Sequence, residues 1–179
     1  MTTLERHNAN TLSVQIPVTL RTATPEDLPK LEWYGQYRHF RGLFRRTFRE
    51  QQADRRLMLV ADVNDFPIGH IFIQLKPEIQ LGVPPHAYFY SFRVMEMFRN
   101  RGIGTLLMSE AEAQALEHGL EWATIAAAKD NHGARRLYER LGYRVFASDE
   151  GSWSYIDHRG RTRSVNEPCW LLEKHLRTV

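Results

Sequence analysis

Cysteine, long apolar runs and net charge are all scarce in this sequence of 179 residues. One cysteine, Cys169, excludes an internal disulfide and any zinc site built from several cysteines, and the eight histidines lack metal-ligand spacing. No apolar stretch approaches the length of a membrane span, and residues 1–12 are too polar for a signal peptide. A formal net charge of +3 does not by itself indicate nucleic acid. We therefore expect a cytoplasmic protein with no metal, no membrane contact and no nucleic-acid partner.

The remaining composition is that of an ordinary globular protein. Hydrophobic residues make up 42% and charged residues 25%, and the length suffices for one sizeable core. No internal repeat or low-complexity tract divides the chain. We predict an N-terminal tail over residues 1–12 and a single domain over residues 13–179.

The beginning of this domain predicts a strand followed by a helix. Apolar and polar residues alternate over Ser13–Arg21, as in a half-buried strand. Thr24 then precedes a proline and two acids, which is typical of a helix start with Thr24 as the N-cap. The side chains expected to point inward from this helix are Leu28, Leu31 and Tyr34.

A second helix is predicted over Phe40–Gln52. Phe40, Phe44 and Phe48 recur at every fourth position and should pack inward. A stripe of arginines runs nearly parallel to them, at Arg38, Arg41, Arg45 and Arg49. We interpret this stripe as a solvated helix face, with a surface for an acidic substrate as the alternative. A nucleic-acid module is not favoured, because no exposed aromatic residues are interleaved with the arginines.

A hairpin and a loop follow the second helix. Arg56–Asp62 and Pro67–Leu75 read as antiparallel strands joined by the turn Asn64–Pro67. His70, within the second strand, is interpreted as a structural histidine rather than a catalytic one. Lys76–Pro85, with its glycine and prolines, predicts a loop.

The second half of the chain predicts a strand, a helix and a strand in one βαβ unit. An aromatic strand spans Ala87–Val94, a helix opens at Gly102 and runs to His118, and an alanine-rich strand spans Glu121–Ala128. The two strands of such a unit are parallel neighbours. Further elements are a helix over Asn131–Leu141 and strands over Tyr143–Ala147, Ser152–Ile156 and Pro168–His175, the last with Cys169 in the core.

The link between the aromatic strand and the helix is a candidate anion site. Gly102 and Gly104 let a ligand approach the backbone closely, and the free N–H groups of the first helical turn point toward it. Arg99 and Arg101 add positive charge beside this turn. A dinucleotide fingerprint would need a third glycine where Leu107 stands, so we favour a phosphate cradle of another kind.

Three features follow one another after the aromatic strand: R-N-R-G-I-G at Arg99–Gly104, a strand of small residues, and N-x-x-A-x-x-L-Y-x-x-x-G-Y at Asn131–Tyr143. In order and spacing they resemble the Gcn5-related N-acetyltransferase (GNAT) superfamily. The resemblance is strongest over Tyr90–Phe146 and extends to the first strand and helix around Leu20–Leu28. It implies an α/β fold with a mixed central sheet of about six or seven strands. This sheet would be splayed between its two parallel central strands and flanked by about four helices.

The same resemblance implies transfer of acetyl from acetyl-coenzyme A to a primary amine by direct attack in a ternary complex. Tyr138 stands at the position of the family's general acid, beside the cofactor. Backbone groups at Phe92 and Val94 would bond the pantetheine arm, and an N–H near Val94 or Met95 would stabilise the oxyanion. Asn131 would contact the cofactor arm. The pyrophosphate would lie in the loop formed by Arg99, Asn100, Arg101, Gly102, Ile103, Gly104 and Thr105, with Arg140 as a further cation near the phosphates.

The general base and the acceptor are left open. Glu96 and Glu167 are candidate carboxylates, although Glu96 replaces a proline common in the family. Further candidates in the same region are Tyr88, Tyr90, Tyr155 and Asp157. The acceptor is a small amine, an amino acid, an aminoglycoside-like molecule or a protein N-terminus, and the chain is a monomer or a homodimer. The alternative from another class is a non-catalytic sensor that binds acyl-coenzyme A without transferring the acyl group.

Overall fold

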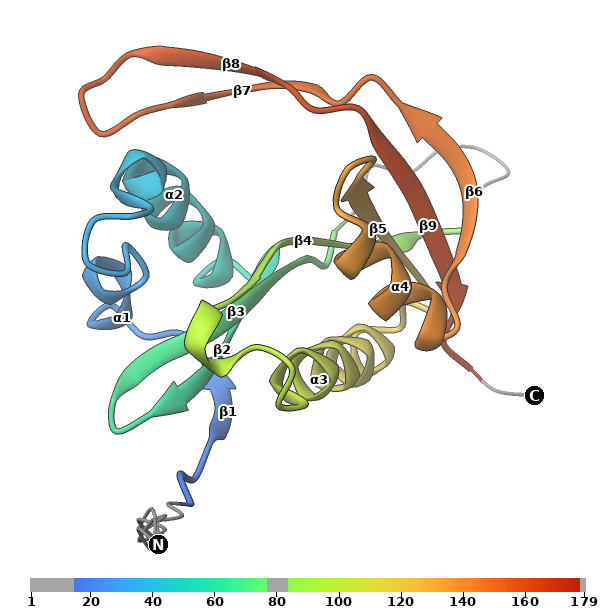
Figure 1. Cartoon of the computed structure of the whole chain (residues 1–179), viewed down its shortest axis with the longest axis horizontal. Helices are drawn as coiled ribbons and strands as arrows, with labels where there is room; N and C mark the ends of the chain where they lie inside the picture. Colours follow the sequence, from blue (N-terminus) through green and yellow to red (C-terminus); the bar gives the residue numbers. More distant parts are fainter. Residues whose placement is uncertain (1–14, 77–83, 178–179) are drawn as a thin grey trace, which may run out of the picture.

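The computed structural model describes residues 15–76 and 84–177, and its centre is a mixed sheet with helices on both faces (Figure 1). The seven strands follow the order β1-β2-β3-β4-β5-β9-β6. Only β4 and β5 are parallel, and the other neighbouring pairs are antiparallel. The bounds are β1 (Thr19–Thr22), β2 (Arg56–Val63), β3 (Phe66–Gln74), β4 (His86–Val94), β5 (Trp122–Ala128), β6 (Arg144–Asp149) and β9 (Cys169–His175). The predicted α/β fold and its parallel central pair are thereby confirmed.

Four α-helices cover the two faces of this sheet in the described part of the chain. The longest, α3 (Ile103–Glu117), links β4 to β5 and packs on one face of β2, β3 and β4. The opposite face carries α1 (Asp27–Lys30) and α2 (Arg41–Gln51), while α4 (His132–Arg140) packs on β5. Two cores result, one between the sheet and α3 and one between the sheet and α2. No helix in the described stretches is long and apolar enough to cross a membrane.

The region around α1 differs from the prediction. The strand begins only at Thr19, and residues 13–14 of the predicted span lie outside the described residues. Leu31 is buried as expected, but Tyr34 is 89% exposed. The reason is that Trp33 and Tyr34 both have positive φ, which ends the helical path and turns Tyr34 outward. Trp33 takes the inner position instead, and its indole N–H donates to the carbonyl of Pro67 at 2.8 Å.

The aromatic helix forms as predicted, with a 3₁₀ turn η1 (Arg38–Phe40) leading into α2. Phe40 and Phe44 are buried and Phe48 packs beside them. The arginine stripe lies on the exposed side, where Arg41 pairs with Glu32 at 2.5 Å. The stripe is thus mainly a solvated face, as the preferred interpretation held.

Two hairpins frame the molecule. The β2–β3 pair is antiparallel as predicted, and most of the predicted loop over Lys76–Pro85 lies outside the described residues. The second hairpin contains a strand that the sequence pattern did not predict, β8 (Thr162–Asn166), which pairs with β7 (Ser152–Ile156). These two strands form a ribbon that continues from β6 and β9 and passes over α2 (Figure 1).

A charge network fastens α1 to the sheet edge. Arg21 donates to both carboxylate oxygens of Asp27, at 2.6 and 2.9 Å, and to Asp62 on β2 at 2.6 Å. Asp27 also accepts the backbone N–H of Thr24 at 2.8 Å and its hydroxyl at 3.3 Å, so the predicted N-cap Thr24 bonds to the acid and makes no side-chain cap bond to a helix N–H. Burial alone would raise the pKa of Asp27, but the bonds from Arg21 and Thr24 outweigh it and the pKa is lowered.

Replacing Asp27 with alanine should therefore destabilise the fold by about 1–3 kcal/mol, because Arg21 and the Thr24 N–H lose their acceptor. Urea unfolding at neutral pH measures this difference. Since the folded pKa of Asp27 is depressed, the difference should be complete above pH of about 4 and shrink as the pH falls further. The control Arg45→Ala, on the exposed face of α2, should stay within about 0.5 kcal/mol of the parent. Equal effects of the two changes would contradict the assigned network.

Candidate active site

The central parallel strands separate halfway along their length. β4 and β5 pair from His86 with Trp122 to Phe89 with Ile125, and no register continues beyond that point. The remaining part of β4 therefore diverges from Ala126–Ala128 of β5. This divergence leaves strand edges without a strand partner in the middle of the sheet, which is where an extended ligand can add hydrogen bonds.

A β-bulge in β4 lies where the two strands part. His70 of β3 faces Arg93 and Phe72 faces Tyr90, so β4 has one residue more than β3 in this interval. Ser91 adopts φ +50 within the bulge. Strict alternation would place Phe92 on the same face as Tyr90. The bulge instead places Phe92 on the α3 face and Arg93 on the α2 face beside Tyr90.

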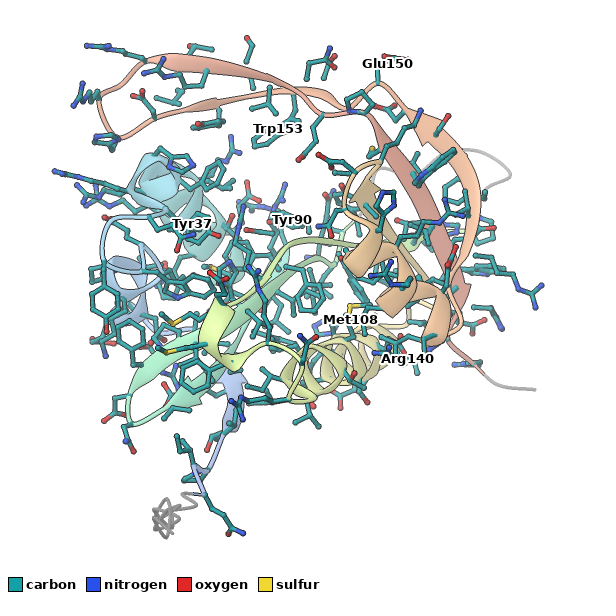
Figure 2. The ribbon with its side chains drawn as sticks, in the orientation of Figure 1. Tyr37, Tyr90, Met108, Arg140, Glu150 and Trp153 are labelled. Carbon is teal, nitrogen blue, oxygen red and sulfur yellow. The ribbon has the colours of Figure 1, made fainter. Side chains whose placement is uncertain are left out.

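A continuous cleft of about 1480 Å³ occupies the space between the separated strands. One part of its lining, here called the glycine-loop half, comes from the α3 and α4 N-termini and from α4. It includes Arg99, Asn100, Gly102, Gly104, Thr105, Asn131, Arg136, Tyr138 and Arg140. The other part, here called the aromatic half, lies between α2, β4 and β7. It includes Tyr37, Phe40, Tyr88, Tyr90, Arg93, Trp153 and Tyr155. Figure 2 shows Tyr90 on β4 and Trp153 on β7 approaching this space from opposite sides.

The glycine-loop half depends on backbone conformations that side chains would obstruct. Gly102 has φ +84, and Asn100 adopts φ +59. A Cβ at Gly104 would lie 3.3 Å from the ring of Phe92. Arg99 fastens the loop to β4, because its Nε donates to the carbonyl of Val94 at 3.0 Å. The side chain of Ile103 is buried in the core, so only its backbone can face the cleft.

Three other predicted positions have roles in the fold. The amide oxygen of Asn131 accepts the N–H of Ala134 at 3.0 Å and caps α4, while its side chain also lines the cleft. Arg101 does not line the cleft, and its Nε donates to the carbonyl of Met97 at 3.4 Å. The N–H of Met95 donates to the carbonyl of Ile68 at 2.8 Å and is therefore not free to act as an oxyanion donor.

Tyr138 lies on α4, lines the cleft and is 4% exposed. The centre of its ring lies 6.2 Å from the ring centre of Phe92 on β4 and 6.3 Å from that of Tyr143. Burial raises the pKa of Tyr138 well above its ordinary value, and the nearby phenol of Tyr88 adds to the shift. The phenol is therefore protonated at neutral pH and is able to donate a proton or a hydrogen bond.

The candidate bases are placed very differently. Glu167 is exposed and lines the cleft, whereas Glu96 is exposed and does not line it. Asp157 is buried in the turn between β7 and β8, where two backbone N–H groups and Arg163 donate to it. These donors lower the pKa of Asp157 to about 2, so it is a structural anion rather than a base.

Four arginines line the cleft that were not predicted as site residues from the sequence: Arg46, Arg56, Arg93 and Arg136. Arg136 lies one turn before Arg140 on α4, and Arg46 lines the cleft from α2. The spacing of Arg136 and Arg140 could have indicated a shared helix face. Arg93 could not have been assigned in this way, because only the bulge places it in the aromatic half.

Solved structures with this arrangement define the class of fold, and they are acetyltransferases. The PaiA N-acetyltransferase of Thermoplasma acidophilum in complex with coenzyme A is 18% identical, with a TM-score of 0.67 over 89% of this chain and 99% of that chain. NAA60 of Arabidopsis thaliana in complex with acetyl-CoA is 19% identical, with a TM-score of 0.65 over 89% and 98%. At such identities the likeness establishes the fold.

The family follows from the sequence. The model of the Acetyltransferase (GNAT) family matches residues 22–143, and the chain belongs to this family. An uncharacterized N-acetyltransferase of Methanocaldococcus jannaschii is 26% identical over 137 residues, which cover 70% of this chain. The chain spans 60% of the length of that relative. The resemblance carried by the loop and helix motifs is thereby confirmed.

Tyr138 and Tyr143 should resist ionisation well above the pH at which a free phenol titrates, because burial raises the pKa of both. Labelling the tyrosine ring carbons with ¹³C and following their NMR shifts from pH 7 to roughly pH 11 should show that the signals of these two residues do not move. The variant Tyr138→Phe should lack one of them. A titration near pH 10 for the signal that this variant lacks would contradict the buried phenol.

Proposed function

We propose that this protein is an acetyl-coenzyme A-dependent N-acetyltransferase that acetylates a primary amine. The observation that carries the proposal is the cleft between β4 and β5, which joins a backbone anion site to a buried phenol. Membership of the acetyltransferase family supports the same reaction. The two compared structures, one with coenzyme A and one with acetyl-CoA, support the same donor.

The residues present fit the acyl donor. Gly104 and Thr105 of the first turn of α3 line the glycine-loop half, where the N–H groups of this turn would bond a pyrophosphate that no Cβ at Gly102 or Gly104 obstructs. Arg99, Arg136 and Arg140 would add positive charge near the phosphates. The free edge of β4 around Phe92 and Val94 would bond the pantetheine arm in the manner of an added strand.

The reaction needs one proton donor and one proton acceptor. A neutral amine attacks the thioester carbonyl, and the tetrahedral adduct then expels coenzyme A as a thiolate. Tyr138 would donate its phenolic proton to that thiolate, for which its burial keeps it protonated. Glu167 is the predicted carboxylate that lines the cleft, and it would accept the amine proton through a water molecule.

Replacing Gly104 with valine should weaken coenzyme A binding at least ~10-fold, because even a Cβ would come within 3.3 Å of Phe92 and 3.5 Å of Leu137. Isothermal titration calorimetry with coenzyme A measures this loss. Leu106→Val places the same side chain on the exposed side of α3 and should bind as the parent does. Undiminished binding by the Gly104 variant would exclude the loop as the phosphate site.

Replacing Tyr138 with phenylalanine should lower kcat by ~10–100-fold and leave coenzyme A affinity nearly unchanged. The physical reason is that the variant keeps the ring but loses the proton donor. Release of the coenzyme A thiol, measured with a panel of amines, gives the rate. Tyr143→Phe is the matched control, since it removes the hydroxyl of a neighbouring buried tyrosine outside the cleft.

Two other outcomes would change the proposal. An unaltered kcat in the Tyr138 variant would remove this residue from the proton transfer. Tight binding of acetyl-coenzyme A without transfer to any amine would favour the sensor over the enzyme.

A further inference from the structure

Arg93 is the exception among the partly buried arginines of the described chain. Five arginines are half-buried there, and four of them pair with a carboxylate. These four pairs are Arg21 with Asp27, Arg41 with Glu32, Arg56 with Glu50 and Arg135 with Glu139. Arg93 has no carboxylate within 4.0 Å among the residues that the structure describes.

The contacts of Arg93 are neutral. Its Nη1 donates to the hydroxyl of Ser91 at 2.6 Å and lies 3.5 Å from Nε2 of His70. Its guanidinium carbon lies 4.7 Å from the ring centre of Tyr37 and 5.0 Å from that of Phe40. Aromatic faces compensate a buried cation only in part, and the guanidinium has further N–H donors in a planar fork. That fork matches the two oxygens of a carboxylate.

His70 is not a second cation that could bind a carboxylate here. It is fully buried, and burial followed by the charge of Arg93 lowers its pKa well below the usual range, so it is neutral. Burial also lowers the pKa of Arg93, yet an arginine remains a cation at neutral pH. A cation without a carboxylate partner therefore lies beside aromatic rings on the wall of the cleft.

The β7–β8 ribbon covers the aromatic half of the cleft. The ring centre of Phe40 lies 4.9 Å from that of Tyr155 and 6.2 Å from that of Trp153, and both of these residues are on the β7–β8 ribbon. Ile156 of the same ribbon lies so close to α2 that a Cβ at Gly42 would come within 3.1 Å of its carbonyl. The ribbon thus bridges the cleft, which favours a small acceptor over the terminus of a folded protein.

We propose that Arg93 binds a carboxylate of the acceptor, so that the acceptor is a small amine of the amino-acid class with an apolar side chain. This inference rests on the proposed function, because it assigns the acceptor to the same cleft. The carboxylate pairs with the guanidinium of Arg93, and the apolar part lies among Tyr37, Tyr90 and Trp153. The amine is then held toward the glycine-loop half, where the acyl group would lie.

The test compares acceptors that differ only in the carboxylate. L-Phenylalanine, L-leucine and L-methionine are assayed against their amides, with release of the coenzyme A thiol as the readout. A larger fraction of an amide's amine is deprotonated, so chemistry alone would favour the amides. The wild-type protein should instead prefer the acids by ~10–100-fold in kcat/KM, as expected for one charged bidentate pair. Equal use of acids and amides, or better use of a peptide with the same N-terminal residue, would overturn the proposal.

The variant Arg93→Met identifies the residue responsible. It should lose the preference mainly through KM, while Arg93→Lys keeps part of it and Arg45→Met, outside the cleft, keeps all of it. Coenzyme A affinity should not change in any of the three. An equal loss with acids and amides would show that Arg93 only supports the fold.

A binding measurement separates this proposal from the proposed function. Calorimetry of L-phenylalanine and its amide with the wild-type protein saturated with coenzyme A needs neither turnover nor a variant. Binding of the acid alone supports the carboxylate site even where no acetyl transfer is found. Binding of neither, in a protein that transfers acetyl to other amines, overturns the carboxylate site and leaves the enzyme function intact.

Discussion

The separation of β4 from β5 is the constraint on which the other features depend. A sheet normally satisfies its backbone groups by pairing each strand along its whole length. Here the pairing ends at Phe89, and the bulge at Ser91 bends β4 away at the same point. The cleft, the exposed edge of β4 and the access of α4 to the centre of the molecule all follow from this single interruption. Tyr138 reaches the middle of the sheet only because no strand fills that space.

The two halves of the cleft use different chemistry. The glycine-loop half offers backbone N–H groups at the start of α3 and several exposed arginines, which suits a strongly hydrated polyanion. The aromatic half offers rings and a partly buried cation, Arg93, that has no carboxylate partner in the described residues, which suits a smaller and less polar molecule. Tyr138 of the glycine-loop half lies near Tyr88 of the aromatic half. This division matches a reaction in which a large donor and a small acceptor meet at one point.

Much of this arrangement could be predicted from local signals. The glycines at the start of α3, the turn that joins β2 to β3, and the motif that contains Tyr138 each depend on neighbouring residues. The features that were not predicted depend on the path of the backbone or on residues far away in the sequence. Tyr34 turns outward because the backbone reverses at positive φ, and β8 forms because it has β7 as a partner. The inward placement of Arg93 needs the extra residue in β4, which no periodicity of a single strand reveals.

The interrupted pairing also has a mechanical consequence. Strands β1 to β4 and strands β5, β9 and β6 are joined in the sheet by only four residue pairs, from His86–Trp122 to Phe89–Ile125. Those four pairs form a short seam at one end, and beyond it the two blocks are connected through the core that α3 and α4 share with both of them. A molecule that bonds to β4 on one side of the cleft and contacts α4 on the other would connect the two blocks directly. Such a molecule would supply connections between the two blocks that the strand pairing itself lacks.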